Sequence, residues 1–69
     1  MWTVEWWQSE EQKKSGQPNI HICKSEAEAI EYAEKLVQTG ISIKRIAAPS
    51  GDTAWTEEQL KERPNQISN

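Results

Sequence analysis

Apolar and polar side chains alternate over residues 2–8 in the manner of a β-strand. One face of this strand carries Trp2, Val4 and Trp6, and the other carries Thr3, Glu5 and Trp7. The next stretch, residues 9–18, is polar and contains a glycine and a proline. It therefore predicts a long hairpin loop.

A second alternating segment, residues 19–24, predicts the strand that returns from this loop. Ile20 and Ile22 share one of its faces, and His21 and Cys23 share the other. We expect an antiparallel pair in which the two isoleucines lie on the same face as the tryptophans at positions 2 and 6.

Residues 26–39 predict the main helix. Ser25 and Glu28 form a capping box, which satisfies backbone donors at a helix start. Apolar residues then recur at helical spacing, namely Ala29, Ile30, Ala33, Leu36 and Val37. Gly40 supplies the left-handed residue that ends a helix.

Residues 41–46 alternate again and are rich in isoleucine, so they predict a third strand. The phase changes at Ile46, which points away from the other two isoleucines unless a bulge intervenes. Residues 48–51 match a type I turn, with proline second and glycine fourth. Residues 53–55 predict a short returning strand.

A second capping box, formed by Thr56 and Gln59, predicts another helix. Trp55 and Leu60 stand where a hydrophobic staple requires apolar side chains. This helix is expected to last two turns and to stop before Pro64.

These elements predict an α+β two-layer sandwich. Its sheet has three to four mainly antiparallel strands, with one main helix in the order ββαβ and a short C-terminal helix. The main helix is expected to cover the face that carries Trp2, Val4, Trp6, Ile20, Ile22, Ile41 and Ile43. Residues 1–63 are expected to form a single domain, and residues 64–69 a disordered tail.

The chain has 69 residues, of which 35% are hydrophobic and 28% are charged, which is enough for one small domain. This length excludes a multidomain enzyme, and no apolar run is long enough to span a membrane. The single Cys23 excludes an internal disulfide, so the fold does not require an oxidising compartment. We expect a cytoplasmic protein.

The net charge of −3 results from eight basic and eleven acidic side chains, and the basic ones are scattered. A non-specific nucleic-acid binder presents clustered lysine and arginine to the phosphates. The charge distribution therefore disfavours nucleic acid as a partner.

The sheet face turned away from the main helix is the first candidate surface. By phase it carries Thr3, Glu5, Trp7, His21, Cys23, Ser42, Lys44 and Ile46. Either the short C-terminal helix covers its apolar members, or they form an interface with a partner protein or a second copy of the chain. The interface hypothesis names Trp7, His21, Cys23 and Ile46.

His21 and Cys23 also raise the question of catalysis or metal binding. Residues two apart on one strand face stand roughly 6–7 Å from each other. Zinc requires three or four ligands, and the chain has no other histidine or cysteine. A nucleophilic cysteine requires a base within hydrogen-bond reach. We therefore expect no catalytic residues, no metal and no cofactor.

The turn over residues 49–53 is the second candidate site, because its backbone amides could accept a phosphate or carboxylate. Basic side chains nearby would add charge, and a tryptophan would add a stacking surface. The residues of this hypothesis are Lys44, Arg45, Ser50, Gly51, Asp52, Thr53 and Trp55. A turn that only satisfies its own backbone explains the same pattern.

Several short patterns carry a resemblance, namely Trp2-x-Val4, Ser25-x-x-Glu28-Ala29, Gly40, Ile46 and Pro49-x-Gly51. With these, the chain resembles small uncharacterised proteins of phage and bacterial genomes that have a strand-strand-helix-strand layout. The resemblance implies a non-enzymatic accessory or regulatory protein and assigns no residue to a role.

The sequence thus predicts a non-enzymatic module that binds, and inhibits or modulates, a partner protein and that associates with itself through its sheet. The alternative is a protein that binds or sequesters a small anionic metabolite or nucleotide.

Overall fold

The computed structural model describes residues 1–62 of the chain, and both Arg63 and the expected tail at residues 64–69 lie outside the described part. The elements in chain order are β1 (Trp2–Trp7), α1 (Glu10–Ser15), β2 (Asn19–Cys23), α2 (Glu26–Gln38), β3 (Ser42–Ala47), β4 (Thr53–Trp55) and α3 (Glu57–Glu62). The four strands form one antiparallel sheet in the order β2-β1-β3-β4. The expected α+β class is confirmed.

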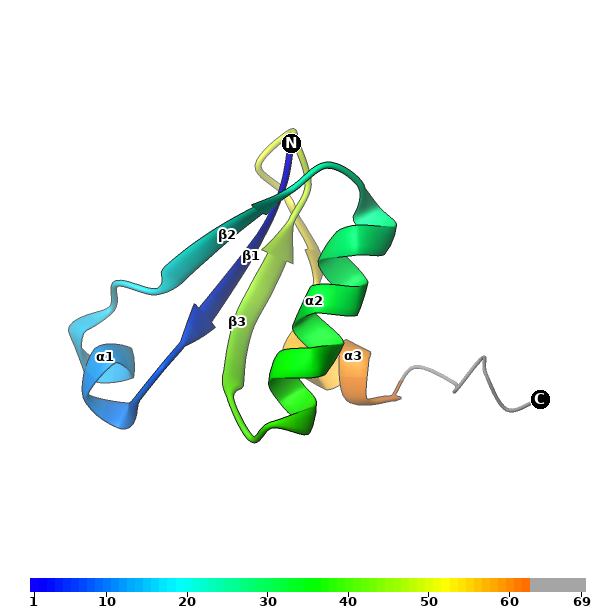
Figure 1. Ribbon diagram of the computed structural model, residues 1–69. Coiled ribbons are helices and arrows are strands. Elements are labelled where there is room, and N and C mark those ends of the chain that lie inside the picture. The colour runs from blue at the N-terminus through cyan, green and yellow to red at the C-terminus, as the bar shows by residue number, and fades with distance from the viewer. Residues whose placement is uncertain (63–69) are drawn as a thin grey trace.

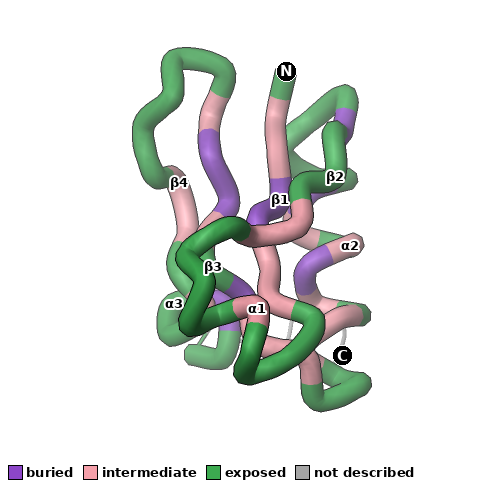
Figure 2. The backbone as a smooth tube through the Cα atoms, turned by 90° about the vertical axis from the view of Figure 1, so that its left-hand side faces the viewer, coloured by how far each residue is buried: buried purple, intermediate pink, exposed green. Residues whose placement is uncertain are grey.

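Two helices cover one face of this sheet. Figure 1 shows α2 lying along the sheet, with α3 beside it. Side chains from both helices and from three strands form one core cluster, which consists of Val4, Cys23, Ala29, Ala33, Ile43, Ile46 and Leu60. The buried stretches in Figure 2 lie mainly on β1, β3 and α2, while most of β2 is exposed. The core is therefore centred on the middle of the sheet and leaves β2 at its margin.

A β-bulge in β3 places its isoleucines on the helix side. Glu5 lies opposite Arg45 and Trp6 lies opposite Ile43, so Lys44 is the extra residue between the two pairs. The bulge restores the phase, and Ile43 and Ile46 are 4% and 0% exposed. The bulge that the sequence pattern required for Ile46 to join the other core residues is present. Ile46 does not lie on the uncovered face, where the interface hypothesis placed it.

The expected orientation of β2 is wrong. His21 lies opposite Val4, and it stacks on Tyr32 of α2 with ring centroids 3.9 Å apart. Directly opposed residues of antiparallel strands share a face, so His21 and Cys23 lie on the helix side. Ile20 and Ile22 lie on the other side and are 62% and 60% exposed. The alternation alone did not distinguish the two faces, because a one-residue shift exchanges them.

The expected loop over residues 9–18 contains the helix α1. Ser9 caps it by accepting a hydrogen bond from the Gln12 backbone N–H at 3.1 Å. The Gln12 side chain in turn accepts one from the Gln8 backbone N–H at 2.7 Å. Gly16 ends the helix with φ of +80°. The capping pair and the glycine were visible in the sequence. The helix itself, EEQKKS, has no apolar periodicity, and it buries no residue.

The other helix boundaries agree with their sequence signals. Ser25 and Thr56 accept hydrogen bonds from the third residue of their helices, and the Gln59 side-chain oxygen accepts one from the Thr56 backbone N–H. At the end of α2 the Gly40 N–H donates to Val37 and the Ile41 N–H donates to Leu36. These two bonds form a Schellman motif, in which Gly40 has φ of +86°.

Gly40→Ala is expected to lower the free energy of unfolding by about 1–2 kcal/mol, because an L-residue is strained at positive φ. Steric overlap contributes nothing, since no atom lies within 4 Å of the added Cβ. Gly40→Asn is the matched control. It is expected to lower the free energy of unfolding by less, because asparagine tolerates this conformation. Urea denaturation measures both. Equal losses for the two variants would contradict the conformational explanation.

Candidate functional site

The sheet face opposite α2 and α3 is not covered by any described element. We call it the open face; it consists of Thr3, Glu5 and Trp7 of β1, Ile20 and Ile22 of β2, Ser42, Lys44, Arg45 and Ala47 of β3, and Thr53 of β4. The face is divided: the charged side chains gather over β1 and β3 together with Trp7, and the two exposed isoleucines lie on β2. These two parts have different chemistry.

The charged part is organised around Glu5. This carboxylate is only 8% exposed, although it lies on the open face. Arg45 Nη2 lies 3.1 Å from one of its oxygens, and Lys44 Nζ lies 3.8 Å from the other. The bulge of β3 makes this possible, because it turns two consecutive basic residues to the same face. A poorly exposed carboxylate is stabilised when it is paired in this way.

The basic side chains of this cluster are already engaged within the protein. Arg45 Nη1 donates to the Gly51 carbonyl oxygen at 3.2 Å and to Thr53 Oγ1 at 3.0 Å. Lys44 Nζ lies over the Trp7 ring, 5.7 Å from its centroid. This distance is within the range of a cation–π interaction. The cluster therefore ties β1, β3 and the turn before β4 together.

The apolar part of the open face is the outer strand of the sheet. Ile20 and Ile22 project from β2, which pairs with β1 on one side only. They are exposed, in contrast to the branched side chains of β1 and β3 that face the core. An exposed β-branched pair on an edge strand combines apolar surface with unpaired backbone donors and acceptors.

The four residues of the interface hypothesis do not share one surface. Trp7 is on the open face, where Lys44 packs on its ring. Cys23 and Ile46 are 4% and 0% exposed and belong to the core cluster, and His21 stacks on α2. The hypothesis assumed that β2 faced the other way and that β3 had no bulge. It therefore combined residues that lie on opposite faces of the sheet.

The residues of the anion-site hypothesis are not gathered around one cavity either. The Arg45 guanidinium is turned to Glu5 and to the turn, as described above. Ser50 and Asp52 bond to each other within the turn, at 3.2 Å. Trp55 lies on the helix side, where its Nε1 donates to Glu26 of α2 at 3.0 Å. The turn closes through the Gly51 N–H and the Ala48 carbonyl oxygen, at 2.8 Å, as the sequence pattern predicts.

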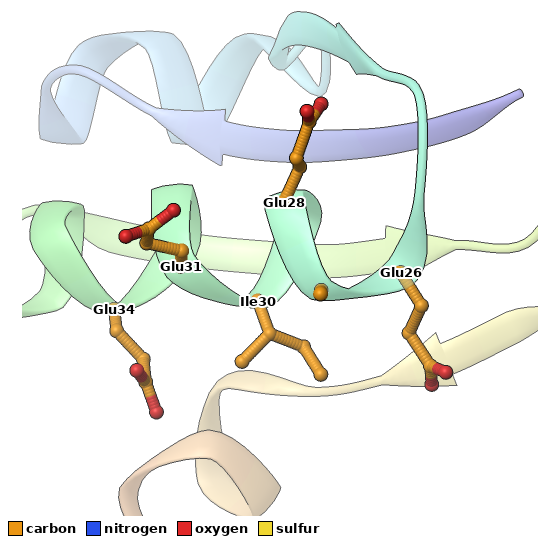
Figure 3. Close-up of a pocket in the computed structure, with 6 residues that line it drawn as sticks. Glu26, Glu28, Ile30, Glu31 and Glu34 are labelled. Atoms are coloured by element: carbon orange, nitrogen blue, oxygen red, sulfur yellow. The ribbon is translucent and has the colours of Figure 1, made fainter.

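The outer surface of α2 carries a row of carboxylates around an open, shallow depression. Figure 3 shows Glu28 and Glu31 turned to one side of Ile30 and Glu26 and Glu34 turned to the other. Among these groups, Glu26 accepts a hydrogen bond from Trp55 Nε1, and Glu28 accepts one from the Lys24 backbone N–H at 3.1 Å. Acidic side chains on a helix surface are ordinarily solvated, and this row shows no ligand geometry.

The buried thiol of Cys23 is a poor nucleophile. Burial raises the pKa of the Cys23 thiol, and the Glu28 carboxylate raises it further. The thiolate is the reactive form of cysteine, so this environment works against covalent catalysis. Among residues 1–62 no three side chains of histidine, cysteine, aspartate or glutamate are grouped to hold a metal ion.

No protein-family model matches the chain, and no curated protein or solved structure matches it either. Within residues 1–62, none of the helices has the length and apolar character needed to cross a membrane.

Three residues that define the open face were in neither of the two candidate sites, namely Glu5, Ile20 and Ile22, although the phase of the first strand already placed Glu5 on this face. A signal for Glu5 was present, because two consecutive basic residues stand at the phase change of the third strand. A bulge at that point presents both to one face. No local signal showed that the isoleucines face away from the helix.

The Glu5–Arg45 pair is expected to contribute more to stability than an ion pair of the same chain whose carboxylate is more exposed. In a double-mutant cycle with Glu5→Gln and Arg45→Met we expect a coupling energy of about 1–2 kcal/mol, because the carboxylate is shielded from water. The Glu57–Lys61 pair, 3.1 Å apart on α3 and with the more exposed carboxylate, is the control. Its coupling is expected to be about 0.3–0.5 kcal/mol. Equal couplings would contradict the special role of Glu5.

Cys23 is expected to react with iodoacetamide more slowly in the native protein than in urea, and its rate is expected to level off at a higher pH. The direction follows from the raised pKa of the thiol. The native state then binds the thiol proton more tightly than the unfolded state, so stability decreases as the pH rises above the ordinary cysteine range. The Cys23→Ala variant should lack this decrease. Equal native and denatured rate profiles would contradict the raised pKa.

Proposed function

We propose that this chain is a non-enzymatic protein-binding module that works through β2 and the adjoining apolar part of the open face. The observation that carries the proposal is the exposure of Ile20 and Ile22, at 62% and 60%, on a strand with one free edge. Large apolar side chains exposed side by side on a small domain are typical of interaction surfaces.

The free edge of β2 supports a binding role for the backbone as well. Edge strands present unpaired N–H and C=O groups, and proteins commonly protect them with charge, proline, bulges or short length. The residues of β2, Asn19–Cys23, contain no formally charged side chain and no proline. The opposite edge, β4, is three residues long and lies beside the Arg45 hydrogen bonds. Of the two edges, β2 is therefore better suited to accept another strand.

An extended segment of a partner would bind by adding a strand to β2. In this mode main-chain hydrogen bonds provide affinity, and alternate side chains provide specificity. The isoleucines would contact the apolar side chains of the partner. By occupying a strand of its partner, the module would inhibit or modulate it. We place this activity in the cytoplasm, since the fold depends on no disulfide.

Two further observations favour protein binding over the alternative functions. The Cys23 thiol has a raised pKa, which does not support a nucleophilic role. The Arg45 guanidinium is engaged by Glu5, Gly51 and Thr53, which does not support an anion site at the turn. The small-ligand function therefore has less support than strand addition.

Site-specific photo-crosslinking tests this function. A benzophenone side chain at position 22 is expected to form covalent adducts with a polypeptide in cells that produce the protein. The same probe at Gln38, which is exposed at the end of α2, is the matched control. The adduct should be identified by mass spectrometry and should disappear when Ile20→Lys is added, because a lysine on an edge strand opposes strand addition.

The absence of any adduct at position 22 would overturn the proposed function. An adduct of equal yield at positions 22 and 38, or one that persists with Ile20→Lys, would also overturn it. Circular dichroism of each purified variant should show that the fold is retained. This is expected because all of the altered side chains are exposed.

A further inference from the structure

We infer that the polypeptide that β2 accepts is a second copy of this chain, paired antiparallel through β2 with His21 on the two-fold axis. This inference rests on the proposed function and names the occupant of the same surface. It would join two four-stranded sheets into one continuous sheet of eight strands.

The first argument is the symmetry of the β2 sequence. An isologous interface requires each surface to be complementary to itself. Ile20 and Ile22 flank His21 at equal distances. In an antiparallel pair centred on His21, Ile20 therefore lies opposite Ile22 of the second copy, and the reverse contact is identical. Cross-strand pairs of β-branched side chains stabilise a sheet. Both apolar pairs would lie on the open face.

The second argument concerns the helix side of the pair. The stacking of His21 on Tyr32 places the middle of α2 beside the centre of β2. A two-fold axis at His21 makes the two α2 helices antiparallel. Glu28 stands one turn before Tyr32 and Lys35 about one turn after it. The symmetry therefore brings Glu28 of each copy toward Lys35 of the other, which are opposite charges. Glu31, which is turned to the same side as Glu28 (Figure 3), stands next to Tyr32 and adds a like charge near the axis.

The third argument concerns the other surfaces that could self-associate. A face-to-face contact of two open faces would cover Glu5, Lys44 and Arg45, and removing charged groups from water is costly. Edge pairing through β2 leaves the exposed parts of Lys44 and Arg45 uncovered, because β1 separates β2 from β3. Pairing through β4 would offer three residues where β2 offers five. Of these surfaces, the β2 edge thus offers the longest strand for pairing and removes the fewest charged groups from water.

The fourth argument is size. A chain of 69 residues buries a small core, and oligomerisation is a common way to stabilise domains of this length. The core cluster consists of seven residues in the described part, and two of these are alanines. Covering Ile20 and Ile22 in a dimer would add apolar burial that the isolated chain lacks.

Sedimentation equilibrium of the purified full chain tests the inference. The wild type is expected to have twice the chain mass of 7.9 kDa. The double variants Ile20→Lys/Ile22→Lys and Ile20→Glu/Ile22→Glu should each associate at least about tenfold more weakly, because like charges would face each other across the axis. The variant Gln38→Lys adds one positive charge away from β2 and should dimerise like the wild type.

Mixing the two double variants in equal amounts tests whether positions 20 and 22 of the two copies lie against each other. If position 20 of one copy faces position 22 of the other, each lysine meets a glutamate, and a heterodimer should form. Ile20→Thr/Ile22→Thr, which retains β-branched side chains at both positions, is the second variant if the charged chains fail to fold. It should remain folded and lose the dimer.

A wild type that remains monomeric at about 0.1 mM, equivalent to a binding free energy weaker than about 5–6 kcal/mol, would overturn the inference. A dimer that survives the charged and threonine variants would overturn it too, since the contact would then lie elsewhere. A mixture that fails to form heterodimers would overturn the contact between positions 20 and 22 of the two copies. The proposed function would survive a monomeric wild type if position 22 still crosslinks to a different polypeptide in cells, and both would fail without any adduct.

Discussion

The bulge at Lys44 governs the chemistry of both faces of the sheet. Without the extra residue, a regular β3 would turn either Ile43 or Ile46 away from the core. With it, both isoleucines pack under the helices, and two consecutive basic side chains reach the Glu5 carboxylate. The apolar core and the charged cluster are thus two results of one change in register, and neither could be removed without disturbing the other.

The properties of β2 follow from its position at the margin of the core. The residues of α2 that pack at the centre of the sheet are alanines, at positions 29 and 33, so the helix can approach β1 and β3 closely. Toward the edge, α2 contacts β2 through the stacking of Tyr32 on His21. The side chains on the other face of β2 receive no cover from any described element. An edge strand with an apolar outer face is consequently a direct result of how the helix packs.

The two parts of the open face differ in what they can bind. Over β1 and β3 the charged groups are paired within the protein, which reduces their capacity to hold a separate anion. Over β2 the surface is apolar and borders unpaired backbone. Binding by strand addition uses both properties of β2 and leaves the exposed parts of Lys44 and Arg45 uncovered. The repeat of isoleucine on each side of His21 makes the same strand complementary to itself.

The amino-acid sequence by itself determined the helix boundaries at Ser25, Gly40 and Thr56 and the turn closed by Gly51, because each depends on hydrogen bonds between residues close in the chain. The short helix after Ser9 carried the same kind of signal, but without an apolar face it was mistaken for a loop. Only the tertiary structure decided which face of β2 is buried, since alternation is equally compatible with both orientations until a helix packs against one. The pairing of Glu5 with two residues about forty positions away, and the free edge of β2, were likewise decided by the strand order.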